Sequence, residues 1–136
     1  RSLLADPRGA DIKDRVNAIK HRQNFRPFAP VILADVVHNY FDMPSGWTSS
    51  PYMQSIARCK FPNDYPAICH HDGTSRVQTV TETDHPGLYK LLKMWYQQTG
   101  CPMLLNTSLN VKGKPMVNSI YDAKVFERRY KVPVLL

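Results

Sequence analysis

The spacing of apolar residues along the chain predicts both helices and strands. The clearest helix covers residues 88–96, where leucines and aromatic residues recur at helical spacing between Pro86 and Gly100. This stripe is typical of a helix that packs on a core rather than of a cofactor site. A shorter stripe over residues 12–19 predicts a second helix with Asp11 as its N-cap.

The remaining pattern completes a mixed fold. Ser119 followed by Asp122 predicts a capped last helix to Tyr130, residues 34–41 fit one or two helical turns, and residues 43–51 predict a surface loop. Continuous or alternating apolar residues predict strands in five segments: 31–33, 52–59, 74–80, 102–105 and 132–136. We therefore expect an α/β fold, a single domain with about three helices packed on one twisted, mixed β-sheet.

Composition places the chain among ordinary globular proteins. It has 136 residues, 43% hydrophobic and 21% charged, which suits one domain with one core. No run approaches the ~20 apolar residues that a membrane span needs. Three irregularly spaced cysteines indicate reduced thiols, so we expect a cytoplasmic protein. The first residue is Arg1 rather than Met, which predicts a piece of a longer protein.

The net charge of +7 is concentrated near the two ends of the chain. Residues 1–26 contain seven cations and three anions, residues 112–136 contain six and two, and the segment between them is close to neutral. A basic balance favours phosphate, nucleic acid or another anionic partner. If the two ends meet in the fold, we expect them to build one anion site.

The first candidate for such a site is formed by Lys20, Arg22 and Arg26, around the start of the rigid segment 25–30, Phe-Arg-Pro-Phe-Ala-Pro. Arginine offers two parallel donors to phosphate, and lysine offers a compact charge. The alternative is a solvated helix end, where cations also interact favourably with the helix dipole.

The second candidate is the segment 106–115, in which Thr107, Ser108 and Asn110 precede Lys112 and its Lys-Gly-Lys turn. Hydroxyl and amide groups beside a cation suit a nucleotide or another phosphorylated ligand. The segment is not a Walker loop, because the required glycines are absent. The alternative is an ordinary polar loop.

A third candidate surrounds the Asp72-Gly73 turn, which His71 and Arg76 flank. A positioned histidine can donate to a leaving or transferring oxygen, so the two side chains are expected to enter an active site together. Structural zinc is not predicted, because the chain has no Cys-x-x-Cys pair.

Blocks over nearly the whole chain resemble the C-terminal domain of NodU/CmcH-type O-carbamoyltransferases. Their order and spacing together are highly specific, although each block is short. They are residues 1–8, 13–17, 20–22, 25–30, 50–53, 71–80 and 104–115. More distantly, Lys20-His-Arg22 is similar to the Lys-x-Arg motif of YrdC-type domains, and Ser108-Leu-Asn110 to their Ser-x-Asn motif.

This resemblance implies an activity. In the family, an N-terminal domain of the actin-like ATPase superfamily transfers a carbamoyl group to an acceptor alcohol. A YrdC-like C-terminal domain makes carbamoyl adenylate from carbamoyl phosphate and ATP, with Mg²⁺ accompanying the nucleotide. The resemblance implies that residues 1–136 are this second domain of a two-domain enzyme, with residues 1–10 as an interdomain linker.

Under this hypothesis, cations neutralise the charge that gathers as a carbamoyl oxygen reaches the α-phosphate of ATP and pyrophosphate leaves. The expected catalytic residues are Lys20, Arg22, His71 and Arg76. The expected nucleotide-binding or carbamoyl-binding residues are Arg26, Thr107, Ser108, Asn110 and Lys112. No metal ligands are expected from the protein.

Two alternatives stay open. One is a double-stranded RNA-binding or nucleotide-binding module without catalysis, suggested by the basic charge. It is disfavoured by the lack of an RNA-recognition or KH motif, and salt-dependent RNA binding without nucleotide binding would support it. The other is a silent domain whose polar loops only dock the absent partner domain.

Overall fold

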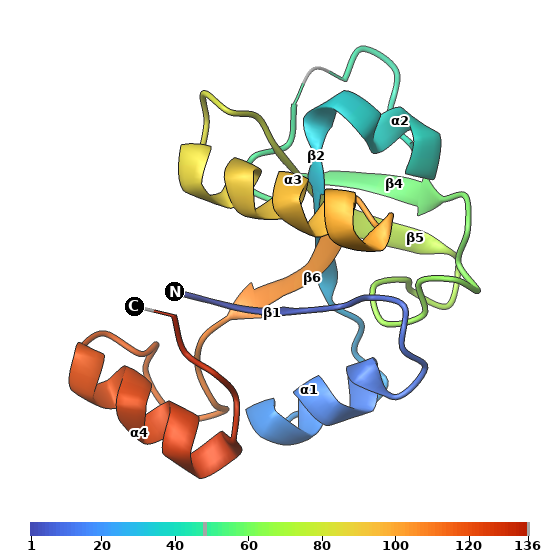
Figure 1. Cartoon of the computed structure of the whole chain (residues 1–136). Coiled ribbons are helices and arrows are strands. Elements are labelled where there is room, and N and C mark those ends of the chain that lie inside the picture. Colours follow the sequence, from blue (N-terminus) through green and yellow to red (C-terminus); the bar gives the residue numbers. More distant parts are fainter. Residues whose placement is uncertain (48, 136) are drawn as a thin grey trace.

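A six-stranded sheet forms the centre of the computed structural model, which describes residues 1–47 and 49–135 (Figure 1). The strands are β1 (Ser2–Ala5), β2 (Ala29–Leu33), β3 (Phe41–Asp42), β4 (Ser55–Cys59), β5 (Thr74–Val80) and β6 (Met103–Ser108). Their spatial order is β1-β6-β2-β5-β4-β3. Only β2 and β5 run parallel among these neighbouring strands, so the sheet is mixed, as the sequence predicts.

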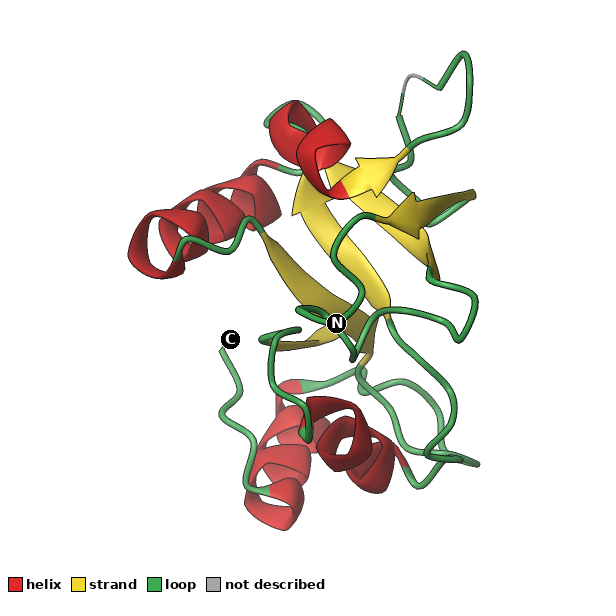
Figure 2. Cartoon of the chain, turned by 90° about the vertical axis from the view of Figure 1, so that its right-hand side faces the viewer, coloured by secondary structure: helices red, strands yellow, loops and turns green. Residues whose placement is uncertain are grey.

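Helices cover the sheet unevenly. They are α1 (Ile12–Lys20), α2 (Val37–Tyr40), which follows a 3-10 turn at Ala34–Val36, α3 (Pro86–Thr99) and α4 (Ile120–Tyr130). The long helix α3 lies across one face of the sheet, whereas α4 lies beside α1 (Figures 1 and 2). The rings of His21 and Tyr130 meet edge to face between α1 and α4, with centroids 6.1 Å apart. Among the described residues, no helix has both the length and the apolar character that crossing a membrane requires.

Local signals explain the elements that the sequence predicts well. Gly100 ends α3 in the left-handed region with φ of 69°, which costs glycine little. Ser119 and Asp122 form the predicted reciprocal capping box at the start of α4. Asp11 occupies the N-cap position of α1, but its side chain makes no capping hydrogen bond and lies 3.7 Å from Arg15 instead.

The predicted final strand is wrong over residues 132–135, which form no strand, while Leu136 lies outside the described residues. Pro133 has no N–H to donate to a sheet, and the backbone N–H of Val134 donates to Glu127 Oε1 at 3.0 Å. This contact ties the segment to α4. In the predicted loop 43–51, Thr48 also lies outside the described residues.

The start of the chain and the start of β4 also differ from expectation. Residues 2–5 of the expected linker form the edge strand β1, which pairs with β6. The predicted strand 52–59 begins only at Ser55, because Met53 adopts a left-handed conformation with φ of 58°.

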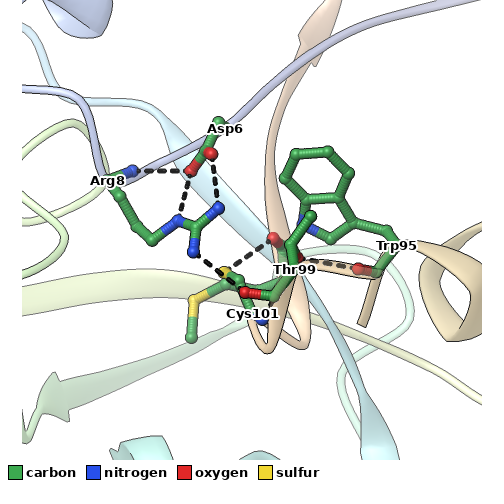
Figure 3. A network of polar contacts seen from close by, with 6 residues as sticks. Asp6, Arg8, Trp95, Thr99 and Cys101 are labelled. Carbon is green, nitrogen blue, oxygen red and sulfur yellow. Dashed lines mark hydrogen bonds and ion pairs between the residues drawn. The ribbon is translucent and has the colours of Figure 1, made fainter. Parts of the chain in front are cut away.

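A polar network holds the segment after β1 against the end of α3 (Figure 3). The guanidinium of Arg8 donates to both oxygens of the Asp6 carboxylate and, at 3.1 Å, to the backbone carbonyl of Thr99. The charge-assisted bond from Arg8 lowers the pKa of Asp6. The positive charge of Arg8 also interacts favourably with the negative end of the helix dipole at the C-terminus of α3.

The core leaves half of one sheet face open. Side chains alternate between faces along each strand, and on the α3 face Val31, Leu33, Val80 and Leu104 pack together under Leu92 of α3. Further along the same strands and on the same face, the side chains become small or polar. They are Ala29 on β2, Arg76 and Gln78 on β5, and Asn106 and Ser108 on β6. The uncovered half of this face carries the candidate site.

Candidate functional site

A polar cavity of about 720 Å³ lies at this uncovered end of the sheet. Six of the nine residues expected to bind or react line it: Arg22, Arg26, His71, Arg76, Thr107 and Ser108. A larger groove of about 930 Å³ between β1, α3 and the C-terminal segment is mainly apolar and contains none of the nine. The smaller cavity is therefore the candidate active site.

The sheet order brings distant parts of the chain to this cavity. The loop from α1 to β2 supplies Arg22 and Arg26, and the turn before β5 supplies His71. Arg76 comes from β5 itself, and Thr107 and Ser108 end β6. The strand β2 lies between β5, to which it is parallel, and β6, to which it is antiparallel. The same end of the sheet therefore contains the amino ends of β2 and β5 and the carboxyl end of β6.

Arg22 is held in place by a buried asparagine on α1. Its Nε donates to Asn17 Oδ1 at 2.6 Å, and Asn17 is fully buried. One further donor, Nη2, bonds the backbone carbonyl of Pro27 at 3.0 Å, and the guanidinium lies 4.0 Å from the ring centre of Phe28. Burial, followed by the positive charge of Arg26, lowers the pKa of Arg22. The guanidinium is thus rigid and lies in a positive potential.

Arg26 and Arg76 are the cations with freedom to meet a ligand. Both side chains are exposed, both line the cavity, and neither forms an ion pair or side-chain hydrogen bond within residues 1–47 and 49–135. His70 and His71 add neutral or cationic donors beside them. This set favours an anionic ligand with several oxygens, such as a phosphate.

The cavity lacks the carboxylates that usually hold Mg²⁺ in proteins. None is among its described lining residues, whose side-chain oxygens belong to hydroxyl and amide groups. Nor do the described parts of the chain contain a cluster of three or more His, Cys, Asp or Glu that would suit a metal ion. The lining therefore suits the oxygens of an anion rather than a metal ion held by protein carboxylates.

Lys20 supports the cavity from behind its wall. Its side chain is buried, and its Nζ donates to the backbone carbonyls of Ser108 and Asn110 and to Asn110 Oδ1 at 2.9 Å. Burial, with a smaller effect of the Arg22 charge, lowers the pKa of Lys20 to about 8. The ammonium is committed to protein oxygens, and Lys20 is not among the lining residues.

The C-terminal basic segment does not reach the cavity wall. The backbone N–H of Lys112 donates to the Lys20 carbonyl at 3.0 Å, so the two basic segments do meet, but the Lys112 side chain is exposed and does not line the cavity. Asn110 is likewise outside the lining, with its Oδ1 occupied by Lys20 and by the Ser108 hydroxyl at 2.6 Å. Arg76, from the nearly neutral middle of the chain, supplies the additional cation instead.

The sequence assigned no role to four residues that shape the site, although one of them, Asn106, begins the candidate segment 106–115. Asn17 anchors Arg22, Met53 lines the cavity, and Asn106 lines it while bonding Gln78 through Nδ2 at 2.8 Å. The signal for Asn106 was its place at the end of an apolar run, directly after Leu104 and Leu105. Gln78 had no comparable signal.

Comparison with known proteins assigns the family. The family model described as carbamoyltransferase C-terminus matches residues 1–136. The chain belongs to this family. The resemblance drawn from the sequence blocks is thereby confirmed, and the cavity is a feature of a carbamoyltransferase C-terminal domain.

Individual relatives agree. Nodulation protein NolO of Bradyrhizobium diazoefficiens is 41% identical over 126 residues, covering 90% of this chain and 23% of that protein. The 3'-hydroxymethylcephem-O-carbamoyltransferase of Amycolatopsis lactamdurans is 38% identical and covers 93% of this chain and 24% of its own length. Nodulation protein U of Rhizobium tropici is 36% identical over 84% of this chain and 20% of that protein. The chain thus spans about a fifth to a quarter of these curated relatives.

Proposed function

We propose that this carbamoyltransferase domain makes carbamoyl adenylate from carbamoyl phosphate and ATP. The carbamoyl group then passes to an acceptor hydroxyl in an N-terminal, actin-like domain of the same enzyme. The observation that carries the proposal is the cavity with three arginines, two histidines and no carboxylate in a member of this family. The relatives' greater length supports a further domain as partner.

The reaction explains why cations dominate the lining. Water splits carbamoyl phosphate into carbamate and phosphate, and a carbamate oxygen then attacks the α-phosphorus of ATP. A new P–O bond forms to the carbamate, the bond from the α-phosphorus to the bridging oxygen breaks, and pyrophosphate leaves with that electron pair. Two anions approach each other in this step, so fixed positive charge stabilises the transition state.

We assign roles by position in the cavity. Arg26 and Arg76 bind phosphate oxygens, because their side chains are exposed and unengaged within the described residues. Arg22 presents a fixed charge beside them. Thr107 and Ser108 add hydroxyl groups at the end of β6, and His71 orients a transferring oxygen. Lys20 holds the Ser108–Asn110 turn in position.

The setting of the reaction also follows from this proposal. ATP is required, and Cys59, Cys69 and Cys101 are all free thiols. These features support a cytoplasmic enzyme. The acceptor hydroxyl belongs to a compound bound by the N-terminal domain.

The test is exchange of labelled pyrophosphate into ATP by the full-length protein, with and without carbamoyl phosphate. We expect exchange that depends on carbamoyl phosphate and falls at least about 100-fold in the Arg26→Ala, Arg76→Ala double variant. The matched control is Lys124→Ala, Arg128→Ala, which removes two exposed cations from α4 outside the cavity. The control should retain wild-type exchange. Absence of exchange in the wild type refutes the activity, and wild-type exchange in the double variant refutes the assigned site.

A further inference from the structure

One atom in the wall of the cavity lacks the partner that its chemistry requires. Asn106 lines the cavity and is 8% exposed, and its Oδ1 is buried with no hydrogen-bond partner among the described residues. Buried carbonyl oxygens in proteins are normally paired, and an unpaired one destabilises the structure. Asn106 is therefore a place where a donor from a ligand is favoured.

The neighbouring residues fix which end of the Asn106 amide is unpaired. Gln78 Nε2 donates to the backbone carbonyl of Pro51 at 2.9 Å, which leaves Gln78 Oε1 to accept from Asn106 Nδ2 at 2.8 Å. Reversing the Asn106 amide would place two carbonyl oxygens against each other. Reversing both amides would turn an oxygen toward the Pro51 carbonyl. The chain Pro51–Gln78–Asn106 thus leaves an acceptor, Asn106 Oδ1, as the unpaired atom of a residue that lines the cavity.

Side-chain acceptors are few in the lining of this cavity. Its charged and titratable groups are three arginines and two histidines, which donate hydrogen bonds to anions, and the other side chains that can accept are hydroxyls such as those of Thr107 and Ser108. Arg76 and Gln78 project from the same face of β5, two residues apart, so the Asn106 pair lies close to the cation that would bind phosphate oxygens. The site therefore matches a group with N–H donors next to a carbonyl or phosphate oxygen.

We infer that Asn106 Oδ1 accepts a hydrogen bond from the amino group of the carbamoyl moiety and selects carbamoyl over acyl groups that lack it. The inference rests on the proposed function. A carbamoyl group carries its NH₂ on the carbon that also bears the oxygens. Its amino group can therefore donate to the acceptor while its oxygens meet the cations. The amino group of adenine is separated from the phosphates by the base and the ribose, which fits this juxtaposition less well.

Asn110 does not take this role. Its Oδ1 already accepts from Lys20 Nζ at 2.9 Å and from the Ser108 hydroxyl at 2.6 Å, and it is not among the lining residues. Asn106 is thus a specificity-determining residue, and Gln78 is the positioning residue that orients it.

The experiment compares carbamoyl phosphate with acetyl phosphate, in which a methyl group replaces the amino group. Pyrophosphate exchange into ATP is measured with each donor, using the full-length protein and its Asn106→Leu variant, which keeps the branched shape of the side chain and removes the acceptor. We expect the wild type to favour carbamoyl phosphate and the ratio of the two rates to fall about tenfold or more in the variant. The ratio is independent of how much of a preparation is folded, because unfolded protein lowers both rates equally.

The outcomes separate the inference from the proposed function. No carbamoyl-phosphate-dependent exchange in the wild type removes both. Exchange in the wild type with an unchanged ratio in Asn106→Leu overturns the inference and leaves the proposed function intact. An unchanged ratio together with a higher KM for ATP assigns Asn106 to the nucleotide, and this also overturns the inference.

Discussion

Lys20 at the end of α1 donates to the side-chain oxygen of Asn110, which lies 90 residues later in the chain, at 2.9 Å. The same ammonium bonds the backbone carbonyls of Ser108 and Asn110, so the loop after β6 folds around one buried cation. The sequence predicted that each of the two residues binds the ligand, and this stays a prediction. In the structure they bond each other, and neither is among the residues that line the cavity.

Replacing Lys20 by Met should destabilise the domain by about 2 to 4 kcal/mol, because several buried oxygens lose a charged donor at once. The free energy of unfolding in urea measures this. Arg15→Met on the same helix is the control; it removes an exposed cation with a 3.7 Å ion pair and should cost less than about 1 kcal/mol. Equal losses in the two variants would contradict the buried role of Lys20.

The stability of the wild type should depend on pH through Lys20. Burial lowers its pKa from 10.5 to about 8, so between these values the folded protein binds fewer protons than the unfolded chain. Stability from this group therefore increases as the pH rises from about 8 toward 10.5. The difference in free energy of unfolding between wild type and Lys20→Met, measured from pH 7 to pH 10, should grow with pH. If this difference in free energy stays constant or decreases with pH, the lowered pKa of Lys20 is contradicted.

Gln78 should control donor selectivity without touching the ligand. Gln78→Met removes the acceptor for Asn106 Nδ2 and frees the amide to turn, so the carbamoyl-to-acetyl rate ratio should fall by roughly threefold to tenfold. Gln78→Glu keeps an acceptor for Asn106 but loses the donor to the Pro51 carbonyl, so it should lower the ratio less than Gln78→Met does. If Gln78→Met and Gln78→Glu lower the carbamoyl-to-acetyl rate ratio equally, Gln78 does not orient Asn106.

Cys69 should be the first thiol to react with iodoacetamide. A hydrogen bond from Cys59 lowers the pKa of Cys69 to about 7, and a hydrogen bond from Ser75 adds to this effect. The pKa of Cys59 is raised instead, and its side chain is buried. The thiolate is the nucleophile, so the alkylation rate of Cys69, followed by mass spectrometry, should reach half its maximum near pH 7.

The Cys59→Ala variant tests the cause of that shift. Removing the donor thiol should move the midpoint of Cys69 alkylation to higher pH, toward the ordinary cysteine value of 9. Cys101, which is 1% exposed, is the internal control and should react slowly in both proteins. A midpoint that does not move excludes Cys59 as the cause.

The sequence by itself determined the elements whose signals are local. The helix α3 ends at Gly100 and α4 begins at a Ser119–Asp122 capping box, because these features depend on residues a few positions apart. The alternation over residues 74–80 likewise predicted β5 with its observed bounds. The family resemblance identified the carbamoyltransferase domain, and the sequence pointed to six residues that line the cavity.

Only the tertiary structure decided what depends on distant partners. Residues 2–5 become a strand because β6 pairs with them, about 100 positions later, and no local pattern encodes that pairing. Lys20 is buried because the Ser108–Asn110 turn surrounds it with oxygens. Arg76 joins Arg22 and Arg26 because β5 lies next to β2 in the sheet. The unpaired acceptor of Asn106 exists because Gln78, two strands away, fixes the direction of its amide.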